Sequence, residues 1–135
     1  MRICTVDHAV RRATEFVVVA GRGFSEGGRT FFVLGIATPS LKSAGGGFCC
    51  AGTEDALLLV EWKSGPQRLE LRDSFEAQSC LHAMTLGSDQ GSDLRVVLRG
   101  VDDPKNLVLD WLQHPRYGSG RKTLTVSSGA LVLAR

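Results

Sequence analysis

The feature that most constrains the fold is a series of short apolar segments, each bounded by glycine, serine, proline or aspartate. Val, Phe and Leu in runs of about four to eight residues between turn-forming residues are typical of β-strands. The chain therefore predicts a mainly β fold of antiparallel sheets built from short strands. The segments are FVVVA, TFFVLGIA, FCCAG, ALLLVEW, RLELRD, DLRVVLRG, TLTV and ALVLA.

Two pairs of these segments are separated by turn residues at hairpin spacing. Ser64, Gly65 and Pro66 lie between LLLVEW and RLELRD, and residues 127–129 lie between TLTV and ALVLA. Glycine and proline supply the backbone conformations that tight turns need. Both pairs therefore predict β-hairpins, which favours antiparallel pairing of the strands.

Three other segments carry helix signals and keep an α+β fold open as the alternative. Residues 5–14 place valine and alanine at helical spacing behind a threonine that suits a cap. Residues 73–86 begin with an aspartate followed three residues later by a glutamate, a variant of the capping box. Residues 103–114 begin with Asp103 and Pro104, which suit a helix start, and Pro115 follows as a stop signal. We expect one or two of these segments at most to be helices.

The glycine-rich segment GRGFSEGG, residues 21–28, lies between two apolar runs and raises the question of a phosphate-binding loop. A dinucleotide fingerprint needs G-x-G-x-x-G between a strand and a helix, because the helix N-terminus binds the pyrophosphate. Here the spacing of the glycines differs, and the following RTFFVLGIA is typical of a strand. We interpret the segment as a loop that joins two antiparallel strands.

Length and charge limit the classes of protein that fit. The chain has 135 residues, the size of one domain, and its net charge of +2 is far from the basic excess of a dedicated nucleic-acid binder. No apolar stretch approaches the ~20 residues of a membrane span, and the N-terminal residues lack the apolar core of a secretory signal. We therefore expect an intracellular, soluble protein without membrane contact.

The cysteines and histidines show no metal-binding or catalytic spacing. The neighbouring pair at 49 and 50 lies in an apolar run, so buried free thiols are favoured over disulfides. No H-x-x-x-H or C-x-x-C pattern occurs, and GFSEG at 23–27 lies between two predicted strands instead of forming the strand-to-helix elbow of a G-x-S-x-G nucleophile, which predicts no metal site, no cofactor and no catalytic residue. A small α+β enzyme without a recognisable motif stays an alternative. The residues considered are Cys4, Cys49, Cys50, Cys80, His8, His82 and His114.

One basic loop has the local chemistry to define a partner. The stretch HPRYGSGRK, residues 114–122, places Arg116, Arg121 and Lys122 around Tyr117. In single-stranded nucleic-acid binding, cations contact phosphates while an aromatic ring stacks on a base. A single loop on a nearly neutral chain offers few phosphate contacts, so weak nucleic-acid binding ranks below a solvated loop.

Three stretches share one internal order: an apolar strand, a glycine, polar turn residues and a second apolar strand. They are VVVAGRGFSEGGRTFFVLG, FCCAGTEDALLLVEW and RVVLRGVDDPKNLVLDW. Over residues 16–112 this order resembles the blades of WD-repeat and related β-propellers, whose blades carry Gly-Ser/Thr, Asp and Trp in sequence. The matching positions are Gly52, Thr53, Asp55 and Trp62 in one blade and Gly100, Asp102 and Trp111 in the next.

The resemblance implies propeller-like blades, with Trp62 and Trp111 packed in the core or between blades. About three blades fit into the chain, whereas propellers close with four to eight. Residues 1–135 would then form either a single domain or a propeller segment with open sheet edges, and such edges recruit other chains. We expect a protein–protein interaction module or a scaffold component of a larger assembly, with other protein chains or its own copies as partners.

Overall fold

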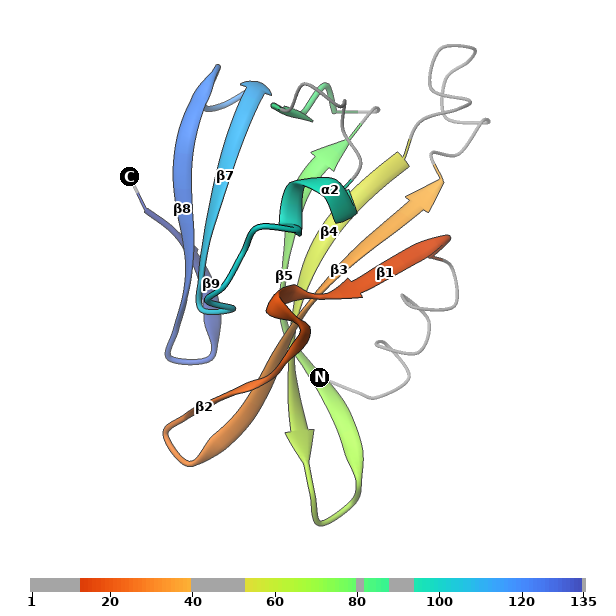
Figure 1. Ribbon diagram of the computed structural model, residues 1–135, viewed down its shortest axis with the longest axis vertical. Helices are drawn as coiled ribbons and strands as arrows, with labels where there is room; N and C mark the ends of the chain where they lie inside the picture. The colour runs from red at the N-terminus through yellow and green to blue at the C-terminus, as the bar shows by residue number, and fades with distance from the viewer. Residues whose placement is uncertain (1–12, 40–52, 80–81, 88–93, 135) are drawn as a thin grey trace.

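The computed structural model describes residues 13–39, 53–79, 82–87 and 94–134, and the prediction of a mainly β fold is confirmed (Figure 1). One sheet has the order β1-β3-β4-β5, with β2 also paired to β3, and the other has the order β6-β7-β8-β9. All pairs are antiparallel. The strands are Glu15–Val18 (β1), Phe24–Glu26 (β2), Arg29–Pro39 (β3), Thr53–Lys63 (β4), Arg68–Ser79 (β5), Thr85–Leu86 (β6), Asn106–Gln113 (β7), Gly120–Ser127 (β8) and Ala130–Leu133 (β9).

The glycine-rich segment connects the antiparallel strands β1 and β3, as predicted, but it also contains a short strand of its own, β2. A short 3-10 helix, Val19–Gly21 (η1), follows β1, and β2 then pairs with β3. Gly27 and Gly28 form the two-residue turn between β2 and β3, at φ of 60° and 76°. Positive φ at both central residues gives the type I′ geometry that suits the twist of a hairpin, and glycine adopts it without strain.

Both predicted hairpins are confirmed. Residues 64–67 connect β4 to β5, whose register closes with Lys63 opposite Arg68. Residues 128–129 connect β8 to β9, and the closing pair is Ser127 opposite Ala130. The central residues of the second turn again have positive φ, 52° and 75°, so it is also of type I′.

The prediction of helices near 73–86 and 103–114 is wrong. Residues 73–79 belong to β5, and residues 85–86 form β6. Asp103 forms a turn instead of a helix cap, because its carboxylate accepts hydrogen bonds from the Lys105 backbone (2.9 Å) and the Asn106 side chain (2.8 Å). The chain then enters β7, where burial alternates with the period of two of a strand. The helix expected near 5–14 falls largely on residues 1–12, outside the described residues.

The segment DLRVVLRG, expected as a strand, contains the helix Leu94–Leu98 (α2). Its first and last residues are four apart and therefore lie on one helix face, and both are buried. They pack toward Gly35 of β3. Tertiary packing therefore overrides the strand propensity of the two valines in between.

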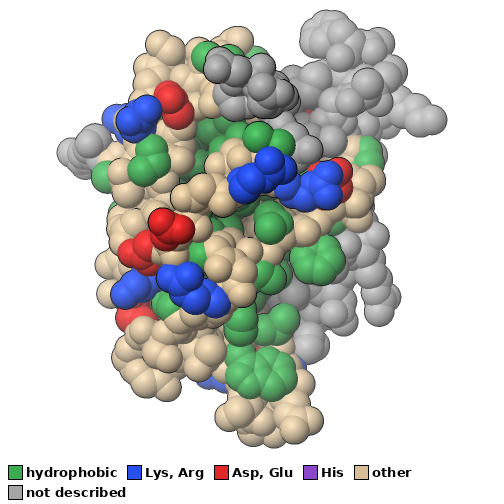
Figure 2. All heavy atoms as spheres, in the orientation of Figure 1, with side chains coloured by type: hydrophobic (Ala, Val, Ile, Leu, Met, Phe, Trp, Pro, Cys, Tyr) green, Lys and Arg blue, Asp and Glu red, His purple; other side chains and the backbone are tan. Residues whose placement is uncertain are grey.

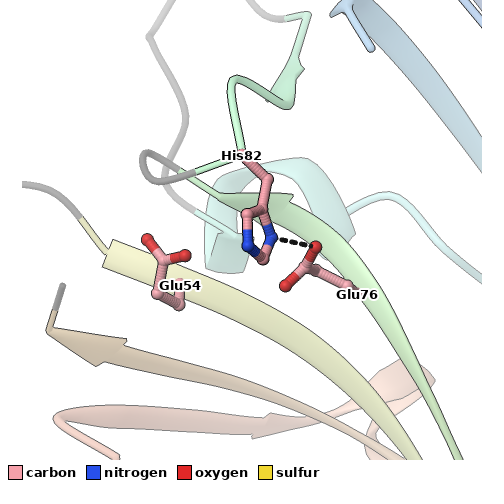
Figure 3. A group of neighbouring side chains, drawn as sticks. All are labelled: Glu54, Glu76 and His82. Atoms are coloured by element: carbon pink, nitrogen blue, oxygen red, sulfur yellow. Dashed lines mark hydrogen bonds and ion pairs between the residues drawn. The ribbon is translucent and has the colours of Figure 1, made fainter. Parts of the chain in front are cut away.

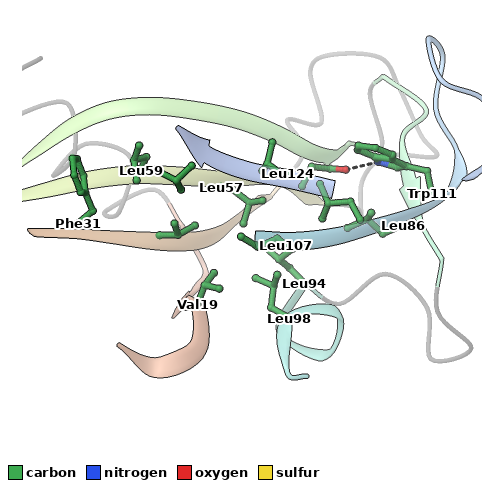
Figure 4. Packing of buried hydrophobic residues seen from close by; sticks show 14 residues of the cluster. Val19, Phe31, Leu57, Leu59, Leu86, Leu94, Leu98, Leu107, Trp111 and Leu124 are labelled. Atoms are coloured by element: carbon green, nitrogen blue, oxygen red, sulfur yellow. Dashed lines mark hydrogen bonds between the residues drawn. The ribbon is translucent and has the colours of Figure 1, made fainter. Parts of the chain in front are cut away.

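The two sheets and α2 share one core (Figure 4). Alternate residues of β7 and β8 point inward and meet residues from β3 and β4, while α2 closes one side of the cluster. Among the described residues, no helix has the length and apolar character that a membrane span requires. The buried members of the core are Val19, Phe31, Val33, Leu57, Leu59, Ala77, Leu86, Leu94, Leu98, Leu107, Leu109, Trp111, Leu124 and Val126.

A second apolar cluster lies on the opposite face of the larger sheet. It consists of residues that alternate with those of the shared core along β3 and β4, together with one residue of β5. Burial on both faces explains why the four residues 57–60 form an unbroken apolar run in the sequence. The buried members are Leu34, Ile36, Leu58, Val60 and Leu71.

Two β-bulges in β5 connect the sheets and position charges. The register with β4 shifts twice, and the extra residues are Arg72 and Ala77. A bulged residue leaves the regular ladder of hydrogen bonds. The carbonyl of Ala77 accepts the indole N–H of Trp111 from the other sheet, at 2.8 Å. The Arg72 side chain reaches the carboxylates of Glu61 and Glu70 at 2.8 Å each.

The close approach of α2 to β3 depends on Gly35, whose missing side chain leaves room for the helix. A Cβ at Gly35 would lie 2.8 Å from Leu98 Cδ1 and 3.1 Å from Leu94 Cδ2. Gly35→Ala is therefore expected to lower the free energy of unfolding by about 1–3 kcal/mol through overpacking, measured by urea denaturation. Gly65→Ala is the matched control, because its Cβ would meet nothing within 4 Å. Equal stability of the two variants would contradict this account.

Candidate functional site

Three side chains with metal-binding atoms meet near the start of β4 and the end of β5, which lie side by side (Figure 3). Glu54 comes from β4, Glu76 from β5 and His82 from the turn after β5. One ligand atom from each lies within 4.8 Å of the other two. The imidazole Nδ1 of His82 is 2.8 Å from Glu76 Oε1. The site thus combines two carboxylates with one imidazole.

The backbone and a buried serine position this group. Ser79 donates its hydroxyl hydrogen to Glu54, and its Oγ accepts the backbone N–H of His82 at 2.9 Å. The hydrogen bond to Glu76 raises the pKa of His82, and the negative charge of Glu76 acts in the same direction. The turn itself is closed by two backbone hydrogen bonds between Ser79 and Met84, each 2.9 Å long.

A buried carboxylate with three cationic partners forms a second polar centre, at the other end of the same strands. Glu61 keeps 2% of its side chain exposed and contacts Arg29 (2.7 Å), Arg72 (2.8 Å) and Lys63 (3.1 Å). The hydrogen bond from Arg29 and the bonds from the other two cations lower the Glu61 pKa to about 2. Glu61 therefore stays ionised at neutral pH and aligns three cationic side chains.

A cavity of about 340 Å³ lies beside Glu61, between the β2–β3 and β4–β5 turns. Arg29, Trp62 and Lys63 line it together with residues of the two turns. Both cations are bound to Glu61. The single negative charge of Glu61 is shared between these two cations and Arg72, and an anionic ligand in the cavity would compete with the Glu61 carboxylate for them.

The basic loop packs its aromatic ring against the protein. The Tyr117 ring lies 5.8 Å from the Trp111 ring and 4.4 Å from the His114 ring. Arg116 and Lys122 lie over the Tyr117 ring, at 5.6 and 5.7 Å from its centroid. The loop's own side chains thus already contact the ring on which a base would have to stack.

The rest of the loop is organised by His114. Its Nδ1 accepts the backbone N–H groups of Arg116 (3.0 Å) and Tyr117 (3.1 Å), and burial lowers its pKa, with the Arg116 charge adding to the effect. Arg121 points instead to Asp110, at 3.6 Å. Figure 2 shows positive and negative side chains interspersed over one face of the molecule, without an extended described area of one sign. Nucleic-acid binding by this loop stays a prediction.

The two tryptophans have different environments. Trp111 is 1% exposed and belongs to the shared core. Trp62 is 38% exposed at the end of β4 and lines the cavity. Asp55, part of the propeller-like pattern, is buried and accepts a hydrogen bond from Gln78 at 2.5 Å.

Neither polar centre was expected from the sequence. Glu54 and Glu76 are far apart in the chain and meet only because β5 pairs with β4 in a register that places Glu54 opposite Ser79. No local spacing reveals such a pair, although Glu61 inside an apolar strand signals a buried charge. The four cysteines and His8 lie outside the described residues.

Comparison of the chain with protein-family models, with curated proteins and with solved structures finds no significant match.

Proposed function

We propose that this chain is a protein–protein interaction module whose contact surface is the outer face of the four-stranded sheet. The observation that carries the proposal is a set of large apolar side chains exposed on that face. Val108 and Leu112 of β7 and Val132 of β9 expose 50%, 63% and 46% of their surface. Single exposed apolar residues are normal in proteins, whereas a group of them on one surface is typical of interaction sites.

The strand register supports a continuous surface. Val108 lies opposite Thr123, and Val132 lies opposite Thr125, two residues further along β8. Partners in an antiparallel ladder point to the same face, so the two threonines lie between the two valines. The inward residues of the same strands fill the shared core, and the outer face is turned away from β3, β4 and β5 (Figure 1).

The occupant we propose is a second copy of this chain. Asp110 and Arg121 form an ion pair across this face, with more than half of each side chain exposed. A face that carries one charge of each sign has no net preference for an acidic or a basic partner, and two copies related by a twofold axis can exchange these partners. The apolar residues around the pair supply the area that association buries.

Light scattering and native mass spectrometry on the purified chain test this proposal. We expect the wild type to form a dimer or larger assembly, and Val108→Lys with Val132→Lys to weaken association roughly tenfold or more, because two charges lose water at the interface. Ser64→Lys, in the β4–β5 turn, is the matched control and should leave assembly unchanged. A wild type that stays monomeric at high concentration, or a double variant that assembles like the wild type, would refute the proposal.

The resemblance to propeller blades stays a prediction. From it we propose that the chain is a scaffold component of a larger assembly. Its support is the connectivity of the second sheet. Strands β6 to β9 pair in chain order, as the four strands of a propeller blade do. The same mass measurement reports the size of any such assembly.

A further inference from the structure

We propose that Glu54, Glu76 and His82 form a binding site for one divalent transition-metal ion, and that zinc is the ion the donor set fits best. The three ligand atoms already lie within 4.8 Å of one another (Figure 3). Zinc bonds to imidazole nitrogen and carboxylate oxygen are about 2.0–2.2 Å long, which places two tetrahedral ligands roughly 3.4 Å apart. Side-chain rotations alone therefore bring these atoms to zinc-binding distances.

The support behind the ligands is already in place. Ser79 is 2% exposed and contacts two of the three residues, through its hydrogen bond to Glu54 and through the His82 backbone. Groups behind a metal site that orient its ligands add substantially to affinity. The antiparallel register between β4 and β5 fixes the two carboxylates on one face of the sheet. The site thus takes one ligand residue from β4, one from β5 and one from the turn after β5, and the fold holds these three segments together.

The types of donor select the class of ion. Magnesium and calcium prefer sites made of oxygen atoms alone, whereas an imidazole favours zinc and its neighbours among the transition metals. With a neutral imidazole the group carries two negative charges, from carboxylates on adjacent strands, and like charges at such positions repel. A divalent cation between them removes this repulsion. Three protein ligands leave the fourth zinc position to a water molecule.

Zinc titration followed by calorimetry and native mass spectrometry tests the site on the full chain. We expect one zinc ion bound through this group, with affinity reduced at least roughly tenfold in each of Glu54→Gln, Glu76→Gln and His82→Gln. Asp102→Asn removes an exposed carboxylate elsewhere and should bind zinc as the wild type does. All ligand residues are at least partly exposed, and circular dichroism verifies that the variants stay folded.

Cys4, Cys49, Cys50 and Cys80 carry thiols that can also bind zinc, so their contribution must be separated. Cobalt in place of zinc distinguishes the two, because thiolate ligands add a charge-transfer band in the near ultraviolet. We expect the wild type to bind cobalt without showing that band, and we expect His82→Gln to lose the bound cobalt. Excess magnesium should not displace zinc from the site. The proposal is overturned if zinc does not bind, if the three variants bind it like the wild type, or if cobalt shows thiolate ligation that the variants leave unchanged.

Discussion

Replacing Trp111 with alanine is expected to destabilise the protein by about 3–5 kcal/mol, the range for truncation of a fully buried large aromatic side chain. The indole fills the core between the sheets and contacts the rings of Phe75, His114 and Tyr117. Its N–H also donates to the bulged Ala77 carbonyl. The variant therefore leaves a cavity, an acceptor without its donor and a loop without its packing surface. Denaturant unfolding followed by circular dichroism measures the loss.

Two further variants separate these contributions. Trp111→Phe keeps most of the apolar packing but loses the hydrogen bond to Ala77, and we expect a loss of about 1–2 kcal/mol beyond the change in side-chain volume. Trp62→Ala is the matched control, because that side chain is 38% exposed and lies outside the core. Its effect should be clearly smaller. If the two alanine variants were equally unstable, Trp111 would not have the special role that its burial indicates.

Glu61→Gln is expected to lower the free energy of unfolding by about 2–3 kcal/mol. The substitution keeps the shape of the side chain but removes the negative charge that pairs with Arg29, Lys63 and Arg72. The loss stays below that of a fully buried ion pair, because the three cations retain 25–44% of their exposure and can turn toward water. Asp102→Asn, an exposed carboxylate outside this cluster, is the control and should change stability little. A neutral effect of Glu61→Gln would show that the cations need no buried counter-charge.

The same carboxylate predicts a dependence of stability on pH. The Glu61 pKa is lowered from 4.5 to about 2 in the folded protein, so folding favours its ionised form. The resulting stabilisation is present above the unfolded value and is lost as the pH falls from about 4.5 toward 2. We expect the wild type to lose stability over this range more steeply than Glu61→Gln, measured by thermal unfolding at a series of pH values. Parallel curves would assign the acid sensitivity to other carboxylates.

Local patterns in the sequence predicted those strands that are bounded by turn-forming residues. The turns at 64–67 and 128–129 were found because glycine, proline and serine specify the backbone there. The helix predicted from Asp103 and Pro104 failed for a related reason, since an aspartate that caps a helix also closes a turn. The alternation of Leu107, Leu109 and Trp111 would have been the better signal, because its period of two matches the burial pattern along β7.

By itself, the sequence determined the mainly β class, the hairpins and the division into apolar and turn-forming segments, because these follow from side-chain periodicity and from the φ angles that glycine permits. Only the tertiary structure decided that Leu94 and Leu98 form a helix on β3, that Glu61 gathers three cations, and that His82 meets two glutamates. The last two arrangements depend on the register of β4 with β5 and on two bulges. A shift of one residue would turn each side chain to the other face of the sheet, and no local pattern specifies that register.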